Sequence, residues 1–121
     1  MPHIHLEYSD QLQALEMKPL LSRINRTLVE NGLFGNASDI KSRAICQQDY
    51  VIGLDESAQA YVHAKISILK GRSTALKQEI SRTVLEVLQD YLPPQNELTL
   101  QLCVEILEMD PDIYSKAIIC P

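Results

Sequence analysis

The fold is decided by an alternating stretch at residues 60–69, AYVHAKISIL. Its even-numbered positions are apolar or small, whereas Tyr61, His63, Lys65 and Ser67 occupy odd-numbered positions. Strict alternation of this kind is typical of a strand with one buried face. The pattern returns in residues 98–109, LTLQLCVEILEM. These two stretches therefore predict two strands.

Apolar residues at helical spacing fill the interval between the two strands. Leu76, Ile80, Val84, Val87, Leu88 and Tyr91 form one stripe, which predicts a helix to about residue 91. Ser73 or Thr74 can cap its start, and Pro93 with Pro94 should end it. The second half of the chain therefore reads as a βαβ unit.

The first half of the chain has the same order. Residues 2–8, PHIHLEY, and 39–48, DIKSRAICQQ, predict strands with one apolar face each. Between them, apolar residues at helical spacing predict a helix over 17–31, which Asn31 and Gly32 should stop. The halves align at a constant offset of 58 residues, from Pro2 to Ala60 and from Ile40 to Leu98. They span about residues 1–50 and 58–110 of a single domain, 1–121, with a turn at 53–59 between them.

A tandem of two βαβ units predicts an α+β fold with a four-stranded mixed sheet. Right-handed crossovers make the strands parallel within each unit, and an antiparallel join places both helices on one face. The other face would lie open, although it carries many uncharged residues, and burial against sister subunits would cover it. These residues are Ile45, Tyr61, Thr99, Cys103 and Leu107. The apolar run 117–120 predicts a short strand added to a sheet edge, on this chain or on a neighbour.

Composition narrows the class of protein. A hydrophobic content of 45% argues against disorder, and a net charge of -5 argues against a nucleic-acid partner. Cys46, Cys103 and Cys120 lack zinc-site or disulfide spacing, which indicates reduced thiols. The chain shows neither a signal peptide nor an apolar run long enough to span a membrane. We expect a soluble, cytoplasmic protein.

Pro2 is the first candidate for chemistry. Removal of Met1 would expose a secondary amine, and a terminal amine has a pKa of about 7.7 to 8 before perturbation. Burial and nearby cations lower that pKa, which would leave a neutral base suited to abstracting a proton beside a carbonyl. The turn Gly71-Arg72-Ser73 lies where a strand ends and a helix begins, a position where open sheets bind ligands. Arg72 is therefore placed to bind a carboxylate.

Four short motifs resemble one family, in the same order over essentially the whole chain. They are MPHI at 1–4, IKSR at 40–43, AYVH at 60–63 and KGRS at 70–73. The chain resembles the 5-carboxymethyl-2-hydroxymuconate isomerase family of the tautomerase superfamily, which includes macrophage migration inhibitory factor. The resemblance implies the tautomerase fold, a homotrimer, Pro2 as catalytic base and Arg72 as a substrate-binding residue.

The resemblance also marks two departures. A second family arginine falls at Lys41, which keeps the charge but loses the planar fork, and Arg43 shares its strand face and is a candidate to assist. Ala117, Ile118 and Ile119 replace an asparagine pair and histidine common at the family's end. The implied reaction is a 1,3-proton shift, enol to keto, on a small anionic unsaturated acid such as 5-carboxymethyl-2-hydroxymuconate, without metal or organic cofactor.

Some alternatives stay open. His3, His5 and His63 lack a metal-ligand spacing of their own, and packing at subunit contacts is the preferred interpretation. A non-catalytic trimer that binds a small ligand, or is purely structural, is the main alternative to an isomerase. A third hypothesis uses the same amine for hydration or decarboxylation of a related acid.

Overall fold

The computed structural model describes residues 2–54, 58–92, 94 and 97–121. Met1, part of the turn at 53–59, and Pro93 lie outside these residues. The described part contains four strands, two α-helices and three short 3-10 turns. They are β1 (His3–Ser9), η1 (Asp10–Leu12), α1 (Met17–Glu30), η2 (Ala37–Asp39), β2 (Lys41–Gln47), β3 (Gln59–Leu69), α2 (Thr74–Tyr91), β4 (Thr99–Met109) and η3 (Pro111–Ile113).

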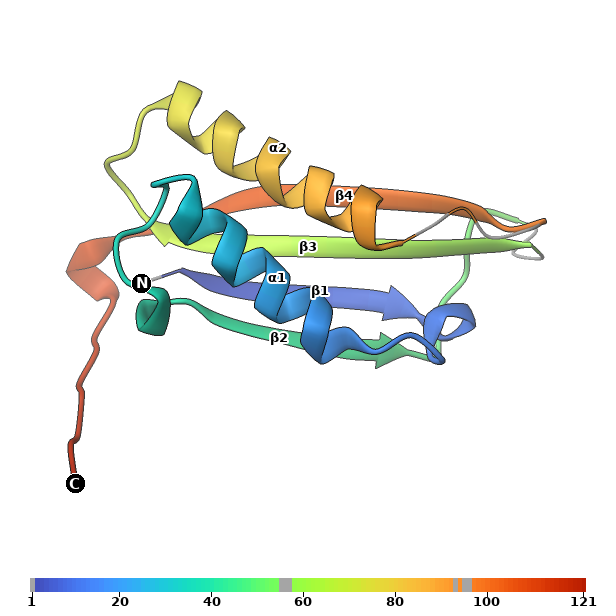
Figure 1. The fold of residues 1–121 in the computed structure, drawn as a ribbon, viewed down its shortest axis with the longest axis horizontal. Coiled ribbons are helices and arrows are strands. Elements are labelled where there is room, and N and C mark those ends of the chain that lie inside the picture. The colour runs from blue at the N-terminus through green and yellow to red at the C-terminus, as the bar shows by residue number, and fades with distance from the viewer. Residues whose placement is uncertain (1, 55–57, 93, 95–96) are drawn as a thin grey trace.

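The strands form one sheet in the order β2-β1-β3-β4. β1 runs parallel to β2, β3 runs parallel to β4, and β1 pairs antiparallel with β3, with His3 opposite Ser67. Both helices cover the same face of this sheet (Figure 1). The topology therefore confirms the predicted tandem of βαβ units with an antiparallel join.

The core fills the space between the helices and the sheet. The even-numbered residues of β3 are fully buried, from Ala60 to Ile68, and alternate with partly exposed ones. The buried stripe of α1 consists of Leu20, Ile24 and Leu28, and that of α2 includes Ile80, Val84 and Leu88. The alternating residues of the strands and the residues that recur every 3.6 positions in the helices thus pack against each other in one layer, as expected when amphipathic helices cover a sheet.

Both helices end and begin where local sequence requires. Ser73 is the N-cap of α2, because its hydroxyl accepts a hydrogen bond from the Leu76 amide at 3.1 Å. α1 ends at Glu30, and Gly32 follows with a φ of 71°, a left-handed conformation that favours glycine. No described helix combines the length and apolar character needed to cross a membrane.

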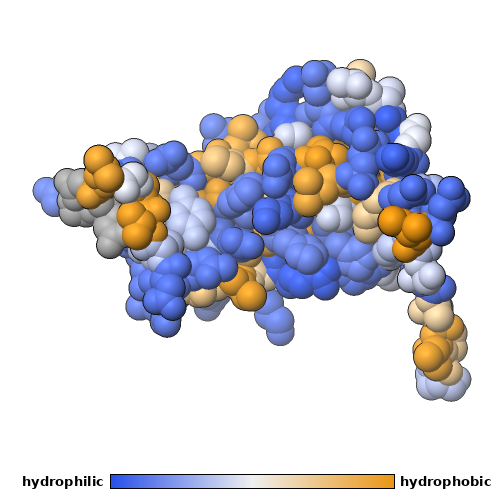
Figure 2. Space-filling view, turned by 180° about the vertical axis from the view of Figure 1, so that it is seen from behind, coloured by the Kyte–Doolittle hydropathy of each residue, from blue (hydrophilic) through white to orange (hydrophobic). Residues whose placement is uncertain are grey.

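The sheet face opposite the helices carries apolar side chains among charged ones. Ile45 is 59% exposed and Leu107 41% exposed on this face. Figure 2 shows hydrophobic patches interleaved with hydrophilic ones on the side seen from behind, and a tail that projects from the body.

Residues 114–121 have no strand, so the predicted extra strand is not formed within this chain. Ile118 and Ile119 lie on the projecting tail, 75% and 93% exposed.

Candidate active site at the amino-terminal end of the sheet

One end of the sheet gathers the segments that carry the predicted site residues. β1 and β2 both begin there because they are parallel, and β3 ends there because it is antiparallel to β1. The Lys41 amide donates to the Pro2 carbonyl at 3.1 Å, and the Lys70 amide donates to the Met109 carbonyl at 3.0 Å. The amino terminus, the β3–α2 turn and the start of the tail thus share one end of the molecule (Figure 1).

Pro2 is buried at this end, directly before β1. Its carbonyl is held by the first residue of β2, so the segment is part of the sheet framework and not a loose terminus. In the encoded chain Met1 acylates the Pro2 nitrogen, which removes its basicity. Catalysis by this nitrogen therefore requires that Met1 be removed.

Arg72 lies half-buried in the turn between β3 and α2. Its Cζ sits 5.1 Å from the centroid of the Phe34 ring, and Nη1 donates to the Leu69 carbonyl at 3.5 Å. Gly71 precedes it with a φ of 125°, which favours glycine. A guanidinium within about 6 Å of a ring centroid is attracted by the ring's negative face, so Phe34 orients Arg72.

Phe34 was missed by the sequence analysis. It is the single phenylalanine of the chain, 7% exposed, in the segment Gly32-Leu33-Phe34-Gly35 after α1. An apolar pair between two glycines, just after a helix stop, has to be buried by a partner from another segment. That pattern was the available signal, but it does not reveal that the partner is the Arg72 turn.

Lys41 lines a hollow of about 470 Å³ at the same end. Its Nζ donates to the Asp39 carbonyl at 2.6 Å. The Asp39 carboxylate in turn pairs with Lys116 of the tail, Oδ1 to Nζ, at 3.5 Å. Eight residues line the hollow: His3, Ser38, Asp39, Lys41, Tyr114, Lys116, Ala117 and Ile118.

Arg43 lies two residues further along β2, exposed on the open face. Its Nη2 donates to His3 Nδ1 at 2.7 Å and to His5 Nε2 at 3.1 Å. Because a guanidinium can only donate, Nδ1 of His3 and Nε2 of His5 must both accept. Each ring is therefore neutral, and the His3 proton lies on Nε2. That nitrogen faces the Tyr114 hydroxyl at 3.0 Å. Arg43 thus shares a face with Lys41 but is engaged with two histidines.

The charges around these histidines agree with neutral rings. Partial burial and the cations Lys41 and Arg43 lower the pKa of His3 below 6.5. Partial burial together with Arg43 and Lys65 lowers the pKa of His5, against a smaller opposite effect of Glu7.

His63 forms no hydrogen bond with either of the other two histidines, all three of which the structure describes, and its Nε2 lies 3.3 Å from Oε1 of Glu105. Within the described ranges, no three histidine, cysteine or acidic side chains lie close enough together to hold a metal ion. Cys46, Cys103 and Cys120 are all free thiols.

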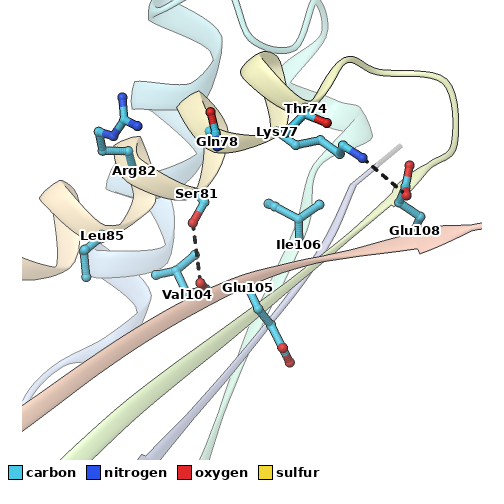
Figure 3. A pocket seen from close by; sticks show the side chains of 10 residues that line it. All are labelled: Thr74, Lys77, Gln78, Ser81, Arg82, Leu85, Val104, Glu105, Ile106 and Glu108. Atoms are coloured by element: carbon cyan, nitrogen blue, oxygen red, sulfur yellow. Dashed lines mark hydrogen bonds and ion pairs between the residues drawn. The ribbon is translucent and has the colours of Figure 1, made fainter.

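A second hollow of about 500 Å³ lies between α2 and β4, away from the predicted residues. The ion pair between Lys77 and Glu108, at 3.4 Å, closes one end, and the Ser81 hydroxyl donates to the Val104 carbonyl at 3.4 Å (Figure 3). Arg82 extends away from the strand in this view. Of the four charged side chains that line this hollow, Lys77 and Glu108 pair with each other, Glu105 pairs with His63, and Arg82 is the fourth.

Two βαβ units and a four-stranded mixed sheet covered by helices on one face define a protein of the tautomerase fold. The family model for 5-carboxymethyl-2-hydroxymuconate isomerase matches residues 2–118. The chain belongs to that family and is an enzyme of the isomerase, or tautomerase, class.

Solved structures share this fold. A 5-carboxymethyl-2-hydroxymuconate isomerase from Deinococcus radiodurans R1 is 29% identical, with a TM-score of 0.87 over 96% of this chain and 88% of that one. A 5-carboxymethyl-2-hydroxymuconate delta-isomerase is 18% identical, with a TM-score of 0.83 over 98% of this chain and 88% of that one. A fused 4-OT, a symmetric trimer, is 12% identical, with a TM-score of 0.75 over 95% and 91%. No curated protein sequence matches the chain.

Proposed function

We propose that the chain catalyses a cofactor-independent 1,3-proton shift, enol to keto, with Pro2 as general base. The substrate class is an unsaturated hydroxy or keto acid with two or three carboxylates, such as 5-carboxymethyl-2-hydroxymuconate. The proposal is supported by the family match, together with the Pro2–Lys41 backbone hydrogen bond and the β3–α2 turn that carries Arg72, which lie at the same end of the sheet.

The proton balance of this reaction needs one base and no redox partner. The neutral Pro2 nitrogen takes the proton of the enol hydroxyl, the oxygen electrons form the carbonyl, and the electron pair of the enol double bond moves to its far carbon, two atoms from the oxygen. The same nitrogen then returns a proton to that carbon, which leaves the ketone and regenerates the amine. Burial of Pro2 and the positive charges of Lys41 and Arg72 favour a low pKa for the freed amine, which suits a base at neutral pH.

Lys41 and Arg72 supply the electrostatic part of the mechanism. Cations fixed before the reaction stabilise the negative charge that spreads over the dienolate. Arg72 can bind a carboxylate with two parallel hydrogen bonds, and its stacking on Phe34 keeps the guanidinium plane in place. Lys41 acts as a point charge, and Arg43 assists from the next position on the same strand face.

The decisive experiment combines intact mass with turnover. Mature protein is expected to lack Met1 and to ketonise 5-carboxymethyl-2-hydroxymuconate, followed by ultraviolet absorbance. Pro2→Ala should reduce kcat by about a hundredfold or more, because it replaces a secondary amine with a primary one in a changed position. Pro19→Ala, in the exposed first turn of α1, is the matched control.

The alternative, a non-catalytic trimer that binds a small acid, makes a different prediction. It is favoured by Lys41 in place of the family arginine and by the altered tail. Such a protein would show a raised melting temperature with the acid and no conversion by NMR. Full activity of Pro2→Ala would also reject the catalytic proposal.

We also propose that the working unit is a cytoplasmic homotrimer. Ile45 and Leu107 on the open sheet face, and Ile118 and Ile119 on the projecting tail, are apolar surfaces that a second copy would cover. The trimeric form of the fused 4-OT structure supports this assembly. Free Cys46, Cys103 and Cys120 agree with a reducing compartment.

A further inference from the structure

The first residues of the tail after β4 contact residues that line the hollow beside Lys41. The Asp110 side chain accepts from the Asp112 amide at 2.9 Å and caps the short turn η3. Tyr114 then contacts His3 at 3.0 Å, and Lys116 pairs with Asp39 at 3.5 Å. Tyr114 thus holds the start of the tail beside β1, and the ion pair with Asp39 directs the Lys116 ammonium toward the hollow.

This position gives the hollow a positive charge in a protein whose net charge is -5. Lys41 and Lys116 contribute two ammonium groups, and Asp39 contributes the one carboxylate among the lining residues. The Lys116 side chain is 27% exposed, although the residue lies in an exposed stretch of the tail. Clefts lined by one sign of charge concentrate ligands of the opposite sign even when the whole molecule repels them.

The two lysines reach Asp39 through different atoms. Lys41 donates to its backbone carbonyl, whereas Lys116 pairs with its carboxylate. A ligand carboxylate can therefore replace the Asp39 side chain at Lys116 without disturbing Lys41. The intramolecular pair holds Lys116 in place until such a ligand arrives.

We infer that Lys116 is a specificity-determining residue that binds a distal carboxylate of the substrate, together with Lys41. This inference rests on the proposed isomerase function, and it assigns to the tail a role in selecting acids with two or more carboxylates over acids with one. Tyr114 is a positioning residue, because its hydroxyl anchors the tail to His3 beside the hollow.

The test compares two substrates on processed, Met1-free protein. 2-Hydroxymuconate carries two carboxylates, and phenylenolpyruvate carries one. Lys116→Gln should raise KM for 2-hydroxymuconate about fivefold to tenfold, with kcat unchanged, and leave both constants for phenylenolpyruvate unaltered. Lys116→Arg should retain most of the wild-type KM. Lys18→Gln, exposed at the start of α1 at the opposite end of the sheet, is the charge-matched control (Figure 1).

A substitution at Asp39 tests the competition directly. Asp39→Asn removes the carboxylate that occupies Lys116 but leaves the backbone carbonyl that Lys41 uses. KM for 2-hydroxymuconate should then fall, by about twofold to fivefold. Tyr114→Ala should release the tail and raise KM for 2-hydroxymuconate alone.

The outcomes separate this inference from the proposed function. If wild-type protein converts neither acid, the isomerase proposal fails. If it converts both acids but Lys116→Gln leaves KM for 2-hydroxymuconate unchanged, the role of Lys116 is refuted while the function stands. An equal loss on both substrates would also overturn the inference, because it would show a general effect on folding or on the reacting end.

Discussion

The contact between Arg72 and Phe34 makes a quantitative prediction about stability that does not depend on the substrate. The guanidinium carbon lies 5.1 Å from the ring centroid, Phe34 is 7% exposed, and Arg72 is half-buried. Cation–π pairs contribute about 0.5 to 1 kcal/mol at exposed sites and about 2 kcal/mol when desolvated. This partly buried pair should therefore contribute about 1 kcal/mol to the free energy of unfolding.

A double-mutant cycle isolates this contribution. Phe34→Leu keeps an apolar side chain in the site, and Arg72→Gln keeps a polar side chain without the charge. The double variant should lose about 1 kcal/mol less than the sum of the two single losses, because the interaction can be lost only once. Urea unfolding followed by far-ultraviolet circular dichroism, at one fixed protomer concentration, gives the four free energies.

The control and the refuting result are clear-cut. Lys18→Gln lies at the other end of the sheet and should be additive with Phe34→Leu to within about 0.5 kcal/mol. If the Phe34 and Arg72 substitutions are equally additive, the ring does not hold the guanidinium. The account of Arg72 as a pre-oriented carboxylate ligand would then lose its physical basis.

Three further predictions concern the same end of the molecule. Because the folded-state pKa values of His3 and His5 are lowered below 6.5, the unfolded chain binds more protons than the folded chain just below that pH. The free energy of unfolding should therefore fall as the pH drops through about 6.5. Urea unfolding at pH 7.5 and 5.5 should show a smaller fall for a His5→Gln variant. Gly71→Ala should cost about 1 to 3 kcal/mol, since φ is 125° there, measured as a lower urea midpoint with an unchanged slope. Ser73→Ala should cost about 1 kcal/mol by the loss of the cap, whereas Ser73→Asp, which keeps an acceptor, should retain the wild-type midpoint.

The topology could be predicted from the sequence because each strand and helix has its own hydrophobic periodicity. Alternation in residues 60–69 and 98–109 follows directly from a sheet with one buried face, and the structure confirms both strands. The antiparallel join followed from treating the chain as a repeat. The cap at Ser73 and the stop before Gly32 are local features that depend on neighbouring residues alone, so they too were predictable.

Contacts of the tail were beyond sequence reasoning for a physical reason. Lys116 meets Asp39, and Tyr114 meets His3, only after the sheet has brought the start of β1 and the end of β4 to the same edge. The tail has no period of its own, since residues 114–121 form no strand. Its apolar run predicts an added strand, but within this chain Ile118 and Ile119 remain exposed. A strand paired with a neighbour stays a prediction.

The repeat also bears on why one end of the sheet, and not the other, is the candidate site. In a pseudo-twofold tandem, each feature at the amino-terminal end has a counterpart at the opposite end. The counterpart of Pro2 is Ala60, whose nitrogen is an internal amide at the start of β3, and the counterpart of Lys41 is Thr99. The turn before α1, residues 13–16, reads QALE and supplies a carboxylate instead of the arginine. At these counterpart positions an internal amide, a threonine and a glutamate stand in place of the amine and the two cations, so the second half of the repeat does not reproduce the groups proposed to abstract a proton and bind anions.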